Sequence, residues 1–287
     1  MKRFLSGLAI LGILLTGKAF ALVDTSLCPQ PPYAVSSGLP LFLSKATGTN
    51  FLLTRIGEMT LESQLKKELG AKFDVQIYPY GGKNLIDGKF KKITATSKNA
   101  TIDGVHISSI KSESVCDYNH FVTKGDDVYS AENFLSKFDV NITSNDIQQT
   151  FAAGKFTKTL ESMSVSMGNI IVFKVFEPSA AIKNNRFDLS MKIISPLITG
   201  GKTKTISMNM GLGVQDGQVQ FTDIKLNQGS ANVNLNALLP VINKLNPFMY
   251  ETTLLKTKGS IVRINDIKMV NNSINIAGTV FIPKTTL

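Results

Sequence analysis

The residues that could do chemistry are few, and their spacing matches no catalytic motif. His106 and His120 are the only histidines, and neither has an obvious nucleophile partner such as a Gly-x-Ser-x-Gly segment would supply. Gly201-Lys202-Thr203 has the ending of a phosphate-binding loop, but Pro196 stands where that loop needs its first glycine. We therefore expect no catalytic residues and no enzyme activity.

A metal site is the next possibility, because Cys116, Asp117 and His120 lie close together and His106 precedes them. A zinc ion would need thiolate and imidazole ligands that converge on it, and one cysteine with two histidines offers no recurring ligand pair. The carboxylates of Asp126-Asp127 are adjacent in the chain and would point in different directions rather than across a cleft. We expect neither a metal ion nor another cofactor.

Two segments place apolar residues just before lysines. The segments are Leu85-Ile86 with Lys89 and Lys91, and Leu197-Ile198 with Lys202. An exposed Leu-Ile tip could enter lipid while the ammonium groups behind it meet phosphates. The alternative is a buried strand start followed by lysines on a solvated face, or by lysines that guard an edge strand.

The first 21 residues have the three parts of a cleavable secretory signal. Lys2 and Arg3 give the positive charge, Phe4 to Leu15 is a short apolar run, and Ala19-Phe20-Ala21 supplies the small residues at a cleavage site. We therefore expect a periplasmic or secreted protein. The rest of the chain has no apolar run of about 20 residues, so no transmembrane span is expected after cleavage.

Two cysteines, Cys28 and Cys116, would remain after cleavage. In an oxidising compartment such a pair is most simply a disulfide that fixes the start of the mature chain to the body of the fold. Two unrelated thiols are the alternative.

The charge of the chain is basic. The full sequence carries 31 Lys and Arg against 21 Asp and Glu, a formal charge of +10, and loss of Lys2, Arg3 and Lys18 with the signal would lower it by three. This excess favours anionic surfaces such as phospholipid membranes. Sparse aromatic residues and the absence of basic runs argue against nucleic-acid binding.

The pattern of apolar residues divides the chain into an extended segment, 22–47, and a single domain, 48–287. Residues 50–69 predict a helix that ends at Gly70, and a second helix runs from Thr143 or Ser144 to about 153. A third is expected over 236–245. Alternating residues predict strands before and after two hairpin turns, Asp216-Gly217 and Asn271-Asn272.

A faint internal repeat suggests that the domain consists of two similar halves. The segment 85–91 resembles 197–204, and each copy is followed by Asp-Gly and then by Ile-Lys at nearly the same distance. Two halves of curved sheet, with helices laid against them, would follow from a true duplication.

Several short segments resemble the LmeA-like phospholipid-binding proteins of the cell envelope. They are Tyr78 to Lys89 with the strand that ends near Ala100 to Val105, then Ile142 to Ile147, Gln215 to Val219, and Leu245 to Phe248. Together they cover roughly residues 50–285. The cysteine pair and a composition rich in Asn and Lys depart from the family.

The resemblance implies an α+β fold in which a curved antiparallel sheet or half-barrel wraps on long helices, similar to tubular lipid-binding folds. It also implies an exported, non-catalytic protein that holds acyl chains in an apolar groove with basic contacts to anionic headgroups. Met208 and Met210 would line such a groove, because their flexible thioether chains adapt to varied partners. The alternative function is a structural or protein-interaction module of the envelope with a fully packed core.

Overall fold

The fold is known from a computed structural model of the 287-residue chain. The structure describes residues 25–29, 35, 49–102, 104–124, 127–154, 158, 165–167, 170–194, 199–215, 217–227 and 260–285. The signal segment, most of the extended segment and the helix expected over 236–245 lie outside the described residues.

Eight strands form the larger, antiparallel sheet. They are β1 (Asp74–Pro79), β2 (Lys89–Ile102), β3 (Val105–Ser114), β4 (Asn119–Lys124), β5 (Asp127–Ser130), β6 (Phe134–Thr143), β12 (Ile261–Val270) and β13 (Ser273–Ile282). Their order is β12-β13-β6-β3-β2-β4-β5, and β1 also pairs with β2. The last strand of the chain therefore lies inside the sheet, between β12 and β6.

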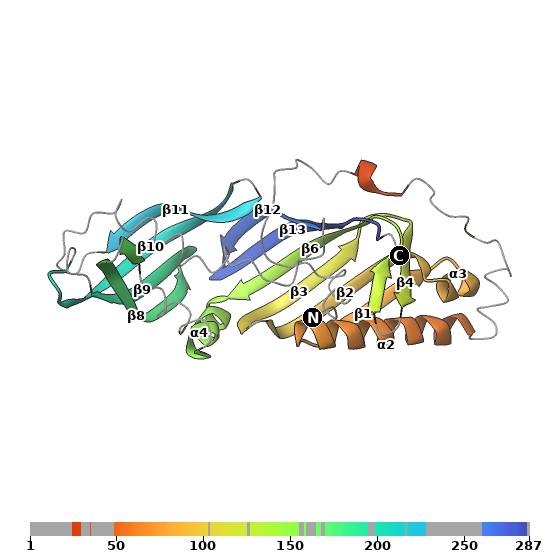
Figure 1. Ribbon diagram of the computed structural model, residues 1–287, viewed down its shortest axis with the longest axis horizontal. Coiled ribbons are helices and arrows are strands. Elements are labelled where there is room, and N and C mark those ends of the chain that lie inside the picture. The colour runs from red at the N-terminus through yellow and green to blue at the C-terminus, as the bar shows by residue number, and fades with distance from the viewer. Residues whose placement is uncertain are drawn as a thin grey trace.

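Five strands form the second antiparallel sheet, in the order β11-β10-β9-β8-β7. They are β7 (Val165–Met167), β8 (Ile170–Lys183), β9 (Arg186–Ile194), β10 (Thr203–Gln215) and β11 (Gln218–Asn227). The backbone N–H of Ile264 on β12 donates to the carbonyl of Gly217, between β10 and β11, at 3.2 Å. The two sheets therefore meet at this hairpin, and they lie at opposite ends of an elongated molecule (Figure 1).

Three α-helices are described: α2 (Thr49–Leu69), α3 (Gly82–Ile86) and α4 (Ser144–Ala152). Thr143 caps α4 and forms a capping box with Asp146, which explains why the helix begins directly at the end of β6. A short 3₁₀ helix, Thr25–Leu27, lies near the N-terminal side of the chain.

The hairpin turns follow from residues that accept a positive φ. Asn271 and Asn272, between β12 and β13, have φ of 51° and 56°, and Asn184 and Asn185 between β8 and β9 are similar. Two consecutive positive φ angles match the twist of the flanking strands. The hairpins predicted around 216–217 and 271–272 are confirmed by the pairing of β10 with β11 and of β12 with β13.

One hydrophobic core extends through both sheets. Its most deeply buried members include Leu65 of α2, Phe134 of β6, Phe187 of β9 and Ile274 of β13. Apolar and polar side chains alternate regularly along β9 and β13, so each strand buries one face only.

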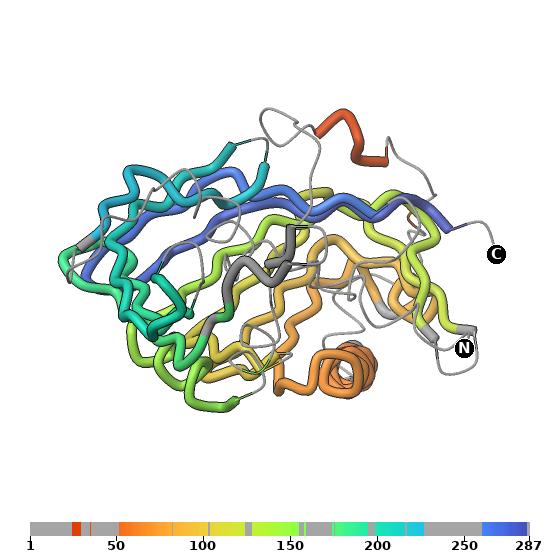
Figure 2. Tube along the Cα trace, turned by 60° about the vertical axis from the view of Figure 1, so that its left-hand side comes forward, coloured from red at the N-terminus to blue at the C-terminus, as the bar shows by residue number. Residues whose placement is uncertain are grey.

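The expected α+β architecture, a sheet or half-barrel wrapped on long helices, is wrong. Strands dominate the described residues, both sheets are open, and α3 and α4 have only five and nine residues. The 21-residue α2 lies beside one margin of the larger sheet and does not form an axis within it (Figures 1 and 2). Alternation in the sequence fixes which face of a strand is buried, but it does not say whether the outermost strands meet.

Helix α2 covers the open edge of β1 through two carboxylates. Ile77 N–H donates to Glu58 Oε1 at 3.0 Å, and Val75 N–H donates to Glu62 Oε1 at 3.4 Å. The other edge of β1 pairs with β2. The helix thus supplies acceptors to an edge that would otherwise be open to another strand.

Candidate functional site

The structure separates the two groups of residues expected to bind lipid. Leu85 and Ile86 lie on α3, and Lys89 and Lys91 lie at the start of β2 in the larger sheet. The other described residues expected to bind lipid are Lys202, just before β10, and Met208 and Met210 within β10. This strand lies at the other end of the molecule (Figure 1). Leu197 and Ile198 lie outside the described residues.

Met208 and Met210 are core residues. Both side chains are buried, and both belong to the continuous hydrophobic core. Lys202 is exposed in the turn before β10, where its N–H donates to the carbonyl of Thr199. Met208 also lines a hollow of about 320 Å³ beside α4, so within the β10 group Met210 shows ordinary core packing and Lys202 is solvated.

Leu85 and Ile86, in contrast, lie at an apolar pocket of about 390 Å³. Most of its wall is apolar, and its apolar lining comes from α2, β1, α3, β2, β4 and β5: Leu61, Ile77, Leu85, Ile86, Phe90, Phe121, Val122 and Val128. Polar contributions come from Thr60, Asp87 and Thr123. Ile86 is 70% exposed, so the pocket has an apolar residue at its solvent side.

The aromatic wall of this pocket is held by packing behind it. The rings of Phe90 and Phe121 are 5.5 Å apart between centroids, and Phe121 lies 5.1 Å from Phe134 in the core. Such tilted pairs are stabilising beyond their buried area. The aromatic wall is therefore an extension of the hydrophobic core, and its rings are buried.

Gly88 fixes the approach of the α3 segment to β4. Its φ is +74°, and an added Cβ would collide with the backbone carbonyl of Phe121. Its own carbonyl accepts from the N–H of Phe121 at 2.9 Å. The turn that follows α3 thus requires glycine both for its backbone conformation and for its contact with the pocket wall.

A second hollow of about 650 Å³ adjoins the pocket along α2, and we call it the α2 groove. It is lined by Ile56, Met59, Thr60, Ser63, Gln64 and Lys67 of the helix, with Thr123 and Val128 opposite. Thr60, Thr123 and Val128 line both hollows, so the groove and the pocket share a wall.

Two of the lysines expected at the rim of a lipid groove, Lys89 and Lys91, lie near the pocket but do not line it. Lys89 and Lys91 flank Phe90, but no lysine lines the pocket among the described residues. Lys91 is exposed where the β1–β2 register shifts. Lys67, on the last turn of α2, is the cation that lines the α2 groove.

His120 lies on β4 next to Phe121, opposite Lys89 in the sheet. Burial lowers the pKa of the His120 imidazole, and the charge of Lys89 lowers it further, although a hydrogen bond with the backbone of Asp87 opposes this. The imidazole is therefore neutral at pH 7. His106 lies on β3, where its Nδ1 is 3.2 Å from Thr101 Oγ1.

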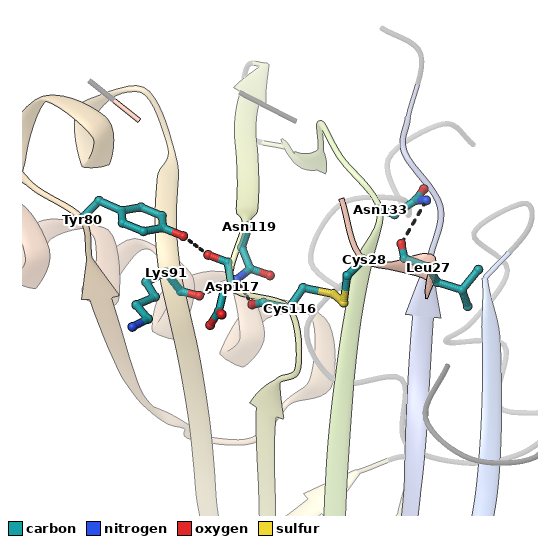
Figure 3. Close-up of a disulfide and its surroundings, with 8 residues drawn as sticks. All are labelled: Leu27, Cys28, Tyr80, Lys91, Cys116, Asp117, Asn119 and Asn133. Atoms are coloured by element: carbon teal, nitrogen blue, oxygen red, sulfur yellow. Dashed lines mark hydrogen bonds between the residues drawn. A yellow bond between two sulfur atoms is a disulfide. The ribbon is translucent and has the colours of Figure 1, made fainter. Parts of the chain in front are cut away.

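Cys28 and Cys116 are joined in a disulfide, with sulfur atoms 2.04 Å apart (Figure 3). Cys116 is buried, and its carbonyl accepts a hydrogen bond from Asn119 Nδ2 at 2.8 Å. The same amide donates to the carbonyl of Lys91 at 2.9 Å. The disulfide therefore joins the segment 25–29 to the loop that leads into β4, and the sulfur of Cys116 is not available to a metal ion.

Two other hollows are more polar. One, of about 320 Å³, lies beside α4 and includes Gln148, Lys183 and Asp188. The other, of about 420 Å³, crosses the outer face of the larger sheet and includes Lys111, Asp139 and Asp266. An acyl chain would leave these charged groups poorly solvated, so the pocket beside α3 is the better candidate.

Leu85 and Ile86, expected from the sequence as a tip that enters lipid, lie at this pocket, and the other residues of its lining were not expected there. Phe121, Val122 and Val128 come from β4 and β5, which pair with the remainder of the sheet through only a short stretch of β2. The spacing of Leu52 and Ile56 places them on a different side of α2 from the buried leucines, but it does not show that this side stays exposed. An apolar side chain carries the same signal in the sequence whether or not another element covers it.

Among the described residues, no helix is both long and apolar enough to cross a membrane. Comparison with protein-family models, curated protein sequences and solved structures gave no match to this chain. The function is therefore argued from the geometry of the site.

Proposed function

We propose that this protein binds a phospholipid without catalysis and holds an acyl chain in the pocket between α2, α3 and β4–β5. The observation that carries the proposal is the apolar pocket of about 390 Å³, which falls within the usual range for small-molecule sites. Each methylene buried there would contribute roughly 0.8 kcal/mol. The resemblance of several short segments to the LmeA-like proteins of the envelope agrees with this proposal.

The headgroup would remain outside the pocket, in the α2 groove. Lys67 lines that groove, and the chain as a whole is basic, which favours an anionic headgroup. We also propose that the protein acts after export, in the periplasm or outside the cell. The disulfide supports this location, because such bonds persist in oxidising compartments.

The alternative, a protein-interaction module with a packed core, agrees with the buried Met208 and Met210 of the second sheet. It does not account for the apolar hollow beside α3, which has the exposed Ile86 at its solvent side.

Binding of cis-parinaric acid, an acyl chain that fluoresces in apolar surroundings, tests the proposal in vesicle-free buffer. We expect saturable binding that dihexanoyl phosphatidylglycerol displaces. Thr60→Phe should weaken this binding at least tenfold, because Thr60 lines the pocket from an exposed position on α2.

Gln148→Phe is the matched control, since it puts the same ring into the polar hollow beside α4. No saturable binding, or equal losses in the two variants, would overturn the proposal. If binding is saturable and Thr60→Phe weakens it selectively, mass spectrometry of lipids extracted from the purified full chain would identify the natural ligand.

A further inference from the structure

Helix α2 is apolar on two opposite sides, and only one of them faces the core. Leu61, Leu65 and Leu69 are buried at intervals of four residues. On the other side, Leu52, Ile56 and Met59 are 61%, 61% and 56% exposed. Their spacing of four and three residues puts them in one stripe along the helix.

Two of the three acidic residues of α2 are engaged by the protein itself. Glu58 and Glu62 both accept from backbone N–H groups of β1, and the third, Glu68, follows Lys67 at the end of the helix. Arg55 forms ion pairs with both, at 3.3 Å and 3.2 Å. The last turn then adds Lys66 and Lys67, which are exposed.

The exposed stripe continues into the mouth of the pocket. Ile56 and Met59 line the α2 groove, which shares a wall with the pocket, and α3 packs beside α2. Ile86, the most exposed of the large apolar residues described, lies at that pocket. The exposed stripe thus ends at a groove that joins the proposed acyl-chain site through Thr60, Thr123 and Val128.

We propose that this face of α2 docks on an anionic phospholipid bilayer and brings the pocket mouth to the membrane surface. The inference rests on the proposed function and adds the surface through which lipid would be exchanged. The helix would lie in the plane of the membrane, with Leu52, Ile56 and Met59 at the acyl boundary. Lys66 and Lys67 would contact headgroup phosphates at the end of the stripe.

The absence of tryptophan from the chain allows a direct test. Met59→Trp puts a single fluorophore on the stripe, and Val270→Trp puts one at an exposed apolar position of β12, remote from α2. With vesicles of phosphatidylcholine and phosphatidylglycerol at 7:3, we expect a blue shift and quenching by brominated lipid for position 59 only. Equal responses at the two positions, or no response at 59, would overturn the docking surface.

A substitution tests the same surface by loss. Leu52→Asp should lower vesicle co-sedimentation at least fivefold while parinaric acid binding in vesicle-free buffer is retained, because Leu52 lines neither the pocket nor the α2 groove. Val270→Asp, the matched control, should leave both measurements unchanged. Vesicle binding that survives Leu52→Asp would contradict the inference. Failure of the unmodified protein to bind parinaric acid would instead contradict the proposed function.

A second copy of the chain is the competing occupant of the stripe. Sedimentation velocity distinguishes self-association from membrane docking. A dimer that Leu52→Asp converts to a monomer would assign the stripe to self-association and overturn the membrane inference. A monomer at all concentrations, with salt-sensitive binding to anionic vesicles that Lys66→Gln and Lys67→Gln weaken, is the expected result.

Discussion

At the scale of single residues, Asp146 holds the start of α4 through the hydrogen bonds that its carboxylate accepts. One of its oxygens accepts from the backbone N–H and hydroxyl of Thr143, both at 2.7 Å, and from the hydroxyl of Ser108. Burial would raise the pKa of Asp146, but these hydrogen bonds outweigh it, so the pKa is lowered from its ordinary value of 3.8. The ionised carboxylate therefore stabilises the start of α4.

We expect Asp146→Asn to lower the free energy of unfolding by about 1–3 kcal/mol at pH 7, as for a buried hydrogen-bond network that loses its charged acceptor. Because the folded pKa lies below the unfolded one, the contribution is fully present above pH 5 and is lost as pH falls through the folded pKa. Urea unfolding from pH 3 to 7 measures this. A difference between the two proteins that grows toward acid pH would contradict the assignment.

Gly88 gives a second prediction at this scale. Gly88→Ala should destabilise the protein by more than the roughly 1–2 kcal/mol that a left-handed backbone costs an alanine, because the new Cβ also meets the Phe121 carbonyl. Gly70→Ala is the control: its φ is +70°, but an added Cβ would have nothing within 4 Å. Thermal unfolding compares them, and equal losses would show that the contact with β4 is unimportant.

At the scale of elements, the contact between α2 and β1 combines packing with edge protection. Glu58→Gln keeps an acceptor for the N–H of Ile77, whereas Glu58→Ala leaves that N–H without one. We expect the alanine variant to lose about 1–3 kcal/mol of stability and the glutamine variant less. Amide hydrogen exchange at Ile77 should accelerate in Glu58→Ala alone. Unchanged exchange at Ile77 would mean that α2 protects the edge of β1 by excluding water and other strands, and not through the Glu58 hydrogen bond.

The same elements show what could be predicted from sequence. The helix expected over 50–69 and both hairpins were predicted correctly, because periodicity and turn residues are local signals. The two open sheets could not be predicted in this way, since strand order depends on contacts between distant segments. The exposure of the α2 stripe could not be predicted for a related reason: the spacing of Leu52 and Ile56 places them on a separate side of the helix, but only the neighbours of the helix decide whether that side is covered.

At the scale of the whole molecule, the disulfide closes a loop of 88 residues that contains α2, α3 and β1 to β3. A cross-link of this span reduces the entropy of the unfolded chain by an amount worth up to about 4 kcal/mol at 25 °C. We expect Cys28→Ala/Cys116→Ala to lower the denaturant midpoint accordingly. The unmodified protein under reducing conditions should match the double variant, and a midpoint that reduction does not change would contradict this contribution.

The internal repeat expected from the sequence is the other prediction at this scale. Two segments, 85–91 and 197–204, resemble each other in sequence. Leu85, at the start of the first, lies at the pocket, whereas Leu197, at the start of the second, lies outside the described residues. The duplication therefore stays a prediction. Among the described residues, the hollow with the more apolar wall lies at the larger sheet beside α2 and α3, which no repeat in the sequence indicates.

The loop closed by Cys28 and Cys116 also determines how the chain would respond to force. A pull on the two ends of an unfolded chain passes through the bridge and bypasses the segment between the cysteines, which are 88 positions apart in the sequence. Roughly 300 Å of contour length stays hidden until the bond is reduced, at about 3.4 Å for each residue. The elements that line most of the pocket would be the part of the molecule that tension cannot stretch.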